Sequence, residues 1–303
     1  PENYTKPIGI LSDASTAMSH SKKLENKRIQ HFDQRMQTQA LQRLQIEGDL
    51  RKAVEREQLR LNYQSIVSLK SKELVAFEAL VRWQRQDHGL IPPNQFIYIA
   101  EENGLITSID FWVLQAACIQ EAEWQTRFGQ ELPISMSINL SSKKLADPKL
   151  TEQIAQVLST SNLAARDLWL EISERAIMED IEANVVMLSK LKATGVQLLI
   201  DDFGTGHSSL NYLSRFPINA IKIDRSFISS MFSGTKDAKI VQSIVGLASN
   251  IGVKVIAEGI ETEEQFIQLK EMDCDYGQGF LFSKPVDDKD ASEIISKQLQ
   301  KRA

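Results

Sequence analysis

Short apolar or alternating runs recur along the chain from Leu59 onward, and segments with helical spacing separate them. The apolar runs cover residues 59–67, 73–83, 134–140, 167–173, 196–202, 220–224, 253–259 and 276–282. The helical segments cover residues 111–125, 150–160, 183–194, 239–251 and 262–272. Strands that alternate with helices in this way are typical of parallel βαβ units. About eight such strands over roughly 245 residues predict an α/β fold of the TIM-type (βα)8 barrel kind.

The first two apolar runs are connected differently from the others. Only about five residues join 59–67 to 73–83, which is too short for a helical crossover. We therefore expect these two strands to pair antiparallel, so that the barrel has a reversed first strand. A doubly wound open sheet is the structural alternative. It is not favoured, because no Gly-x-Gly-x-x-Gly motif follows the first strand.

The chain before residue 58 is polar, rich in Gln, Lys and Arg, and its pattern predicts an N-terminal helical segment. Its apolar positions roughly keep helical spacing, although Gly48 weakens the pattern: Met36, Ala40, Leu41, Leu44, Leu50 and Val54. Three interpretations remain open. The helix could connect two domains, form a dimer seam, or pack as an amphipathic helix on its own domain.

Composition narrows the class of protein. The net charge of -5 argues against binding to a nucleic-acid polymer, but not against a small anionic substrate, because bound divalent cations reverse the local charge. Cys118 and Cys274 lie far apart without metal-like spacing, which favours two core side chains in a reducing, cytoplasmic setting. No apolar run reaches the roughly 20 residues of a membrane span. The chain has neither a signal peptide nor an initiator Met, so it reads as a piece of a longer protein that other parts could tether to a membrane.

Polar side chains gather at the carboxyl ends of the predicted strands, where barrel active sites lie. They are Glu78, Asn139, Glu171, Asp201, Asp202, Lys222, Glu258, Glu261 and Gln278. One such residue alone would be read as a cap or a surface group, and Lys222 alone as half of a structural ion pair. Together they predict a site of oxygen ligands, which favours magnesium or manganese over zinc. Two adjacent aspartates suit hydrolysis of a phosphoester by two metal ions.

Three short motifs resemble parts of other kinds of active site, but the residues that accompany them in those sites are missing. Asp202, Phe203 and Gly204 match the metal-binding tripeptide of kinases, without the other kinase motifs. The sequence from Gly204 to residue 206 lacks the Lys-Ser/Thr of a P-loop. His207 stands beside two serines, but neighbouring residues rarely face each other as nucleophile and base, so we interpret it as a loop residue.

The same residues resemble the EAL domain family of cyclic di-GMP phosphodiesterases. Glu78, Ala79 and Leu80 form the signature tripeptide within FEALVRW, and the resemblance extends over about residues 46–295. The matching segments follow in order: YQSIV, IPPNQFIYIAEENGLI, SINLSS, LEISE, DDFGTGHSSL, IKIDRSFI, VIAEGIET and CDYGQGFLFSKP. Ser173 replaces the more usual Thr and keeps the hydroxyl. An unrelated oxygen-ligated barrel hydrolase would require this ordered series to be accidental.

The resemblance implies a role for each matching residue. Ligands of two divalent cations, magnesium or manganese, would be Glu78, Asn139, Glu171, Asp201 and Asp202. Lys222 would orient or activate the attacking water, Glu258 would be a metal ligand or general base, and Gln278 would position water or substrate. Substrate contacts would come from Gln64, Arg82 and Glu261, and Glu174 would hold the DDFGTG loop. The implied reaction is attack of metal-activated water on cyclic di-GMP to give linear pGpG; the alternative is a receptor that binds cyclic di-GMP without cleaving it.

A second resemblance concerns the N-terminal stretch. LSDASTAMSHSKKLENKRIQHFDQRM is similar to the last helix and strand of GGDEF domains, with Ser15 and Ser19 in place of an Asp and a Tyr of that family. We therefore expect residues 1–45 to be the remnant of a GGDEF-like domain with a connecting helix, and residues 46–303 to be the EAL domain. The resemblance also implies a homodimer and upstream GGDEF and sensory domains as partners.

Overall fold

The computed structural model describes residues 32–86, 88–129, 134–206, 213–231 and 235–302, together with six positions between residues 10 and 18. Most of the expected GGDEF-like remnant lies outside the described residues, as do His207 and the two serines that follow it. Among the described residues, no helix combines the length and the apolar composition that crossing a bilayer requires.

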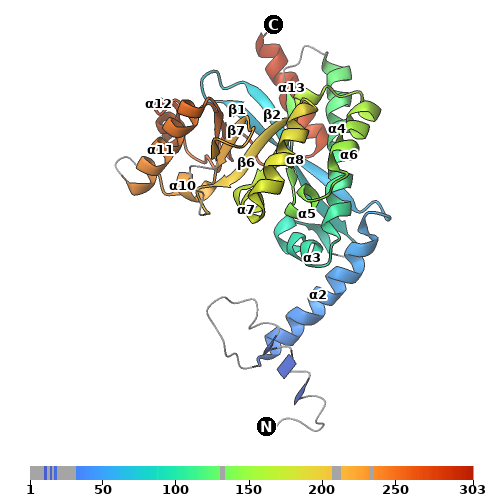
Figure 1. Ribbon diagram of the computed structural model, residues 1–303. Coiled ribbons are helices and arrows are strands. Elements are labelled where there is room, and N and C mark those ends of the chain that lie inside the picture. The colour runs from blue at the N-terminus through green and yellow to red at the C-terminus, as the bar shows by residue number, and fades with distance from the viewer. Residues whose placement is uncertain are drawn as a thin grey trace.

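Eight strands close into a barrel with one reversed strand (Figure 1). In barrel order they are β1 (Leu59–Ser68), β9 (Tyr276–Gln278), β8 (Lys254–Ala257), β7 (Ala220–Ile223), β6 (Gln197–Phe203), β5 (Leu168–Ser173), β4 (Ser135–Leu140) and β2 (Leu74–Arg85). β1 pairs antiparallel with both β2 and β9, and every other pairing within the barrel is parallel. The expected TIM-type barrel with an antiparallel first strand is therefore confirmed. A short strand, β3 (Gly89–Ile91), extends β2 outside the barrel.

The inside of the barrel is built in layers, because side chains on a strand alternate between its two faces. An apolar cluster fills one layer with Ile66, Ala76, Leu199, Ala220 and Ile256. On β2, β6, β7 and β8 the residue two positions later is charged: Glu78, Asp201, Lys222 and Glu258. Because β1 runs in the opposite direction, its polar residue Gln64 comes two positions before the apolar Ile66. The apolar layer thus closes the barrel beneath a polar layer at one end.

Long helices surround the barrel, and short ones follow the strand ends. The long helices are α4 (Ile106–Phe128), α6 (Leu150–Ser161), α8 (Ile181–Ala193), α11 (Lys236–Ile251), α12 (Glu263–Glu271) and α13 (Asp288–Arg302). The short elements are η1 (Pro93–Gln95), α3 (Ile97–Glu102), α5 (Ser142–Leu145), η2 (Ala165–Asp167), α7 (Glu174–Glu179) and α10 (Arg225–Ser229). Side chains of Ser141, Ser173 and Asp224 cap α5, α7 and α10, which begin directly after β4, β5 and β7. These caps fix the backbone where the polar layer ends.

An N-terminal helix, α2 (Gln34–Ala53), extends away from the barrel (Figure 1). Its last turns dock on the barrel: Leu50 and Ala53 are buried in the core, while Leu44 is 64% exposed. Asp49 accepts hydrogen bonds from the Arg85 guanidinium at 2.6 and 2.9 Å, which ties α2 to the end of β2. The N-terminal helical segment is confirmed. The helix continues through residues 45 and 46, and the division of the chain at that point stays a prediction.

Candidate active site

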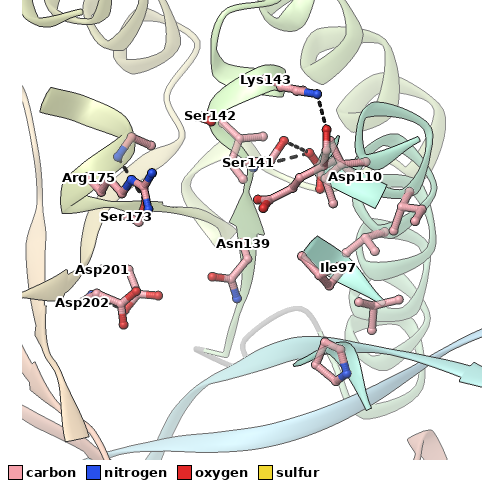
Figure 2. A pocket seen from close by; sticks show the side chains of 18 of the residues that line it. Ile97, Asp110, Asn139, Ser141, Ser142, Lys143, Ser173, Arg175, Asp201 and Asp202 are labelled. Atoms are coloured by element: carbon pink, nitrogen blue, oxygen red, sulfur yellow. Dashed lines mark hydrogen bonds between the residues drawn. The ribbon is translucent and has the colours of Figure 1, made fainter. Parts of the chain in front are cut away.

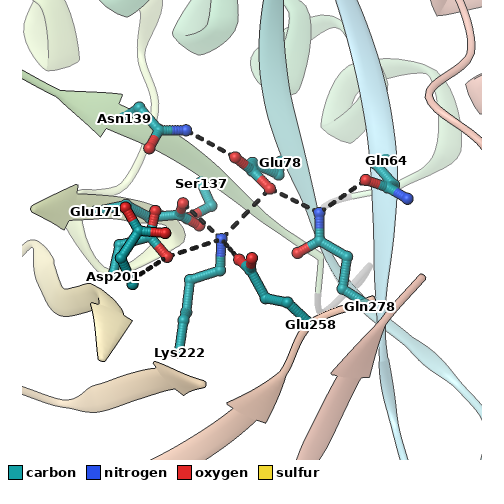
Figure 3. Close-up of polar contacts among 10 residues, drawn as sticks. Gln64, Glu78, Ser137, Asn139, Glu171, Asp201, Lys222, Glu258 and Gln278 are labelled. Carbon is teal, nitrogen blue, oxygen red and sulfur yellow. Dashed lines mark hydrogen bonds and ion pairs between the residues drawn. The ribbon is translucent and has the colours of Figure 1, made fainter. Parts of the chain in front are cut away.

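Lys222 lies at the centre of the polar layer, surrounded by carboxylates from four other strands or strand ends (Figure 3). Its side chain on β7 is fully buried. The ammonium Nζ lies 2.7 Å from Glu171 Oε2, 3.3 Å from Glu78 Oε2 and 3.8 Å from Asp201 Oδ1, and it also pairs with Glu258. Residues that are up to 180 positions apart in the sequence therefore meet at one cation, as the strand-end pattern predicts.

One ammonium group does not balance this many carboxylates. Burial, and then the neighbouring Glu78 charge, raises the pKa of Glu171 well above its ordinary value. Burial also raises the pKa of Glu258 to about 8, with Asp201 and Glu78 adding to the rise and Lys222 opposing it. Although burial alone would lower the pKa of Lys222, the surrounding carboxylates raise it well above its ordinary value. The site therefore keeps its lysine charged, and a bound cation would stabilise the ionised form of the carboxylates whose pKa values burial and repulsion raise.

Glu78 accepts hydrogen bonds from two side-chain amides. Asn139 Nδ2 donates to Glu78 Oε1 at 2.6 Å, and Gln278 Nε2 donates to Glu78 Oε2 at 2.6 Å. Burial would raise the pKa of Glu78, but Lys222 and these amide donors outweigh burial and lower it. Glu78 therefore stays ionised. Gln278 Nε2 donates to Gln64 Oε1 as well, at 3.0 Å, which brings Gln64 into the cluster.

Asp201 and Asp202 face the same cavity although they are neighbours on β6 (Figure 2). Successive side chains of a regular strand would point to opposite faces. Here the register between β6 and β7 shifts after Ile200, and Asp202 adopts a left-handed backbone conformation with φ 55°. Its N–H donates to Asp201 Oδ1 at 2.9 Å. Burial and the nearby Asp201 and Asp224 charges raise the pKa of Asp202 to about 6.

Glu174 holds the beginning of the DDFGTG loop. The carboxylate is buried at the start of α7 and accepts a hydrogen bond from the Gly204 N–H at 2.8 Å. Gly206 packs against the same carboxylate, because a Cβ at that position would lie only 2.5 Å from Glu174 Oε1. The geometry therefore agrees with the loop-stabilising role expected for Glu174.

A cavity of about 550 Å3 opens beside the carboxylates (Figure 2). The cavity is lined by Asn139, Asp201 and Asp202 together with apolar residues such as Ile97 and Val113. Two cations, Lys143 and Arg175, also line it. This volume and this mixture of apolar and polar residues suit a small organic ligand.

Two of the expected substrate contacts, Arg82 and Glu261, are not among the residues that line this cavity. Arg82 is half-buried on β2 and donates to the Val81 carbonyl at 2.9 Å. Glu261 is exposed just before α12, and its backbone N–H donates to Gln265 Oε1 at 2.8 Å. The ion pairs of Lys222 involve Glu78, Glu171, Asp201 and Glu258. Arg82 and Glu261 take no part in these four ion pairs.

The donor set fits hard divalent cations, since it consists of carboxylate and amide oxygens. Within the described residues, no group of three or more His, Cys, Asp or Glu side chains is arranged as a metal cage. The carboxylates contact the Lys222 ammonium and the amide donors instead. The chemistry of the residues, carboxylate and amide oxygens without sulfur or imidazole ligands, thus fits a hard divalent cation.

Three further residues take part that the sequence analysis missed. Ser137 is buried on β4 and donates from Oγ to Glu171 Oε1 at 2.6 Å. It lies two positions before Asn139, so strand alternation could have found it. Asp224 caps α10 and acts electrostatically on Asp202. Asp110 on α4 accepts from the Ser141 Oγ at 2.5 Å and steadies the turn after Asn139.

Comparison with known proteins gives consistent matches. The EAL domain family matches residues 47–285. Two curated proteins of Pseudomonas aeruginosa are similar over 277 residues, which is 91% of this chain: the cyclic di-GMP phosphodiesterase NbdA at 39% identity and the bifunctional diguanylate cyclase/cyclic di-GMP phosphodiesterase MucR at 40%. The match covers 35% and 40% of these two relatives, so the chain spans little more than a third of their length. A solved structure of the PaMucR phosphodiesterase in complex with c-di-GMP superposes with a TM-score of 0.78 at 40% identity, covering 82% of this chain and 99% of that one.

Proposed function

The chain belongs to the EAL domain family, and we propose that it hydrolyses cyclic di-GMP to linear pGpG. The observation that carries this proposal is the cluster of Glu78, Glu171, Asp201 and Glu258 around Lys222, beside a cavity of about 550 Å3. The names of the relatives NbdA and MucR support the choice of substrate. In the reaction, water adds to phosphorus, the P–O3′ bond breaks, and the departing 3′ oxygen gains a proton.

We assign three catalytic residues. Lys222, whose pKa is raised by the surrounding carboxylates, stays protonated, so it stabilises the negative charge that develops on the phosphoryl group. Glu258 contacts Lys222 and has a pKa of about 8, which suits a group that accepts a proton from water near neutral pH. Gln278 orients water or substrate next to Glu78.

Five residues would hold two divalent cations, magnesium or manganese: Glu78, Asn139, Glu171, Asp201 and Asp202. When bound, such ions lower the pKa of water and neutralise charge on the phosphate. The oxygen-only donor set supports this assignment, as do the raised pKa values of Glu171 and Glu258, which a bound cation would lower. Arg82, Glu261 and Gln64 would contact the substrate, and Glu174 would keep the loop after β6 in place.

The direct test is to incubate the protein with cyclic di-GMP and either magnesium or manganese, and to detect pGpG by chromatography. Glu78→Ala should reduce turnover roughly a hundredfold or more, because it removes a carboxylate that the cations and Lys222 share. Glu182→Ala is the matched control: this exposed carboxylate pairs with Arg215 on the surface, so turnover should not change. Tight binding of cyclic di-GMP without pGpG in either metal would contradict hydrolysis and would favour a receptor.

We further propose that the chain works in the cytoplasm as a homodimer, downstream of a GGDEF domain. The bifunctional name of MucR and the excess length of the relatives support an upstream domain. The buried, unpaired Cys118 and Cys274 support a reducing compartment. Light scattering after size-exclusion chromatography tests the dimer; a monomeric mass at micromolar concentration, with and without cyclic di-GMP, would contradict it.

A further inference from the structure

The carboxamide of Gln278 is held in a single orientation. Its side chain is 4% exposed, and Nε2 donates both to Glu78 Oε2 at 2.6 Å and to Gln64 Oε1 at 3.0 Å. The other end of the amide, Oε1, is a buried acceptor without a hydrogen-bond partner among the described residues. A buried acceptor that stays unpartnered costs free energy, so such an atom is expected to receive a donor from outside the chain. Oε1 is therefore available to water or substrate.

Gln64 determines which end of the Gln278 amide is free. A carboxamide has one donor end and one acceptor end. Gln64 Nε2 donates to the main-chain carbonyl of Ser283 at 3.1 Å, and a carbonyl can only accept. The donor end of Gln64 is therefore fixed on Ser283, and its acceptor end Oε1 faces Gln278. Rotating the Gln278 amide by half a turn would place its oxygen against two acceptors, Gln64 Oε1 and Glu78 Oε2.

The position of Gln64 follows from the reversed strand. β1 closes the barrel between β2 and β9, with Gln64 opposite Glu78 and Ile66 opposite Gln278. Ser65, next to Gln64, fixes the segment that carries the Ser283 carbonyl: Ser65 N donates to Ser283 Oγ at 3.2 Å, and the two hydroxyls lie 2.7 Å apart. A chain of hydrogen bonds thus runs from Ser283 through Gln64 and Gln278 to Glu78 and links β1 to β9 and β2. Figure 3 shows its part from Gln64 to Glu78.

We propose that Gln64 is a positioning residue for the reaction, in addition to any contact it makes with substrate. It holds the Gln278 amide so that Oε1 is presented as a fixed acceptor for the attacking water. Without Gln64, the Gln278 amide keeps only its bond to Glu78 and rotates more freely. This inference rests on the proposed hydrolysis of cyclic di-GMP.

The test compares Gln64→Leu and Gln64→Ala with the parent in steady-state hydrolysis of cyclic di-GMP. We expect kcat to fall about tenfold or more while KM stays within about twofold, because orientation of Gln278 is lost and the substrate surface is kept. In a Gln278→Ala background, Gln64→Leu should cause no further loss of kcat, since there is no amide left to position. Ser68→Ala is the matched control: Ser68 lies on the same strand opposite Tyr276, and its hydroxyl accepts from the Ser71 N–H in the hairpin turn, so kcat should not change.

Each alternative has a distinct result. A raised KM with unchanged kcat in both Gln64 variants would overturn positioning and would assign Gln64 to substrate binding alone. Additive losses in the double variant would overturn it as well. Melting temperatures of all variants check that they fold, and Gln64→Ala replaces Gln64→Leu if the larger side chain prevents folding. A parent protein that produces no pGpG would refute the proposed function itself, and the positioning role with it.

Discussion

Asp202 shows how the backbone of one residue prepares this site. Its left-handed conformation, with φ 55°, and the register shift on β6 bring two adjacent carboxylates to one cavity. A residue with a Cβ adopts this conformation at a cost of roughly 1–2 kcal/mol, although Asp tolerates it better than most. Backbone strain of this kind persists where function requires it. Asp202 therefore disfavours folding in two ways, through its left-handed backbone conformation and through a carboxylate whose ionisation is disfavoured.

Substitutions at Asp202 should separate stability from activity. Asp202→Gly removes the Cβ that disfavours a positive φ, whereas Asp202→Ala keeps it. We expect Asp202→Gly to be more stable than Asp202→Ala by about 1 kcal/mol in urea unfolding, while both lose most of their turnover. Equal stability of the two variants would show that the left-handed conformation at this position is not maintained in solution.

Gly206 is expected to be essential for the loop that Glu174 holds. A Cβ at this position would lie 2.5 Å from Glu174 Oε1, so Gly206→Ala should displace the loop and lower turnover about tenfold or more. Gly246→Ala on α11 is the control, because no heavy atom lies within 4 Å of its Cβ and alanine favours a helix interior. The control should keep full turnover and gain about 0.5–1 kcal/mol of stability. Equal turnover in both variants would contradict the role of this contact.

The side chains that strands place inward could be predicted from the sequence, but their mutual contacts could not. Alternation along a strand puts Glu78, Asp201 and Lys222 in the barrel interior whatever the pairing. The bond between Gln64 and Gln278 joins residues 214 positions apart and depends on β1 pairing with β9. The left-handed backbone of Asp202 depends likewise on the register between β6 and β7. Such features arise from tertiary pairing, which a local pattern does not encode.

At the level of elements, the longer strands β1, β2, β4, β5 and β6 and the five long helices α4, α6, α8, α11 and α12 agree with the sequence pattern, because each is long enough to show its period. The strands β7, β8 and β9 have only three or four residues and were predicted from their apolar runs. The short elements β3, α3, α5, α7 and α10 have three to six residues and show no period. β9 ends at Gln278, earlier than the apolar run 276–282 predicts. A Cβ on Gly279 would lie 2.1 Å from the Ile260 carbonyl oxygen, so the chain packs there against backbone instead of continuing as a strand.

The last turns of helix α2 pack on the barrel, and we expect them to contribute to the free energy of unfolding. Leu50 is 2% exposed in the core, so Leu50→Ala should lower the free energy of unfolding by about 2–5 kcal/mol. Leu44→Ala, in the same helix but 64% exposed, should change it by no more than about 0.5 kcal/mol. Chemical denaturation followed by circular dichroism measures both. Similar losses in the two variants would mean that the N-terminal part of α2 also packs on a partner, such as a second copy of the chain.

For the whole molecule, the polar layer is a source of instability that cations should relieve. Burial and mutual repulsion raise the pKa of Glu171 and of Glu258, so ionising both carboxylates costs folding free energy. A cation that binds only the folded state stabilises it in proportion to the logarithm of its concentration. We therefore expect millimolar magnesium or manganese to raise the melting temperature by several degrees. Sodium chloride of equal ionic strength is the control, and Glu78→Ala should reduce the shift; an equal shift in that variant would contradict the assigned ligands.

Glu121 offers a second, independent test of how buried charge sets stability, away from the active site. It lies on α4 near the residues that precede β5, since Gln125 of the next turn donates to Asp167 at 3.1 Å. Its side chain is fully buried, and Oε2 has no hydrogen-bond partner among the described residues. Burial raises the pKa of Glu121 to about 8, with Asp167 adding to the rise and Gln125 opposing it.

The sign of the pH dependence follows from this raised pKa. Below about pH 4.5 the carboxyl group is protonated in both the folded and the unfolded chain, so it imposes no pH-dependent penalty. Between about pH 4.5 and 8 the unfolded chain releases the proton while the folded chain keeps it, so stability declines as pH rises; above about pH 8 the penalty is constant. Glu121→Gln removes the titration, and its advantage over the parent should grow across this window to on the order of 2 kcal/mol, with turnover unchanged. Urea unfolding at several pH values measures it, with the exposed Glu123→Gln on the same helix as control. Parallel stability curves for parent and Glu121→Gln would show that the Glu121 carboxylate gains a partner or solvent in the folded protein.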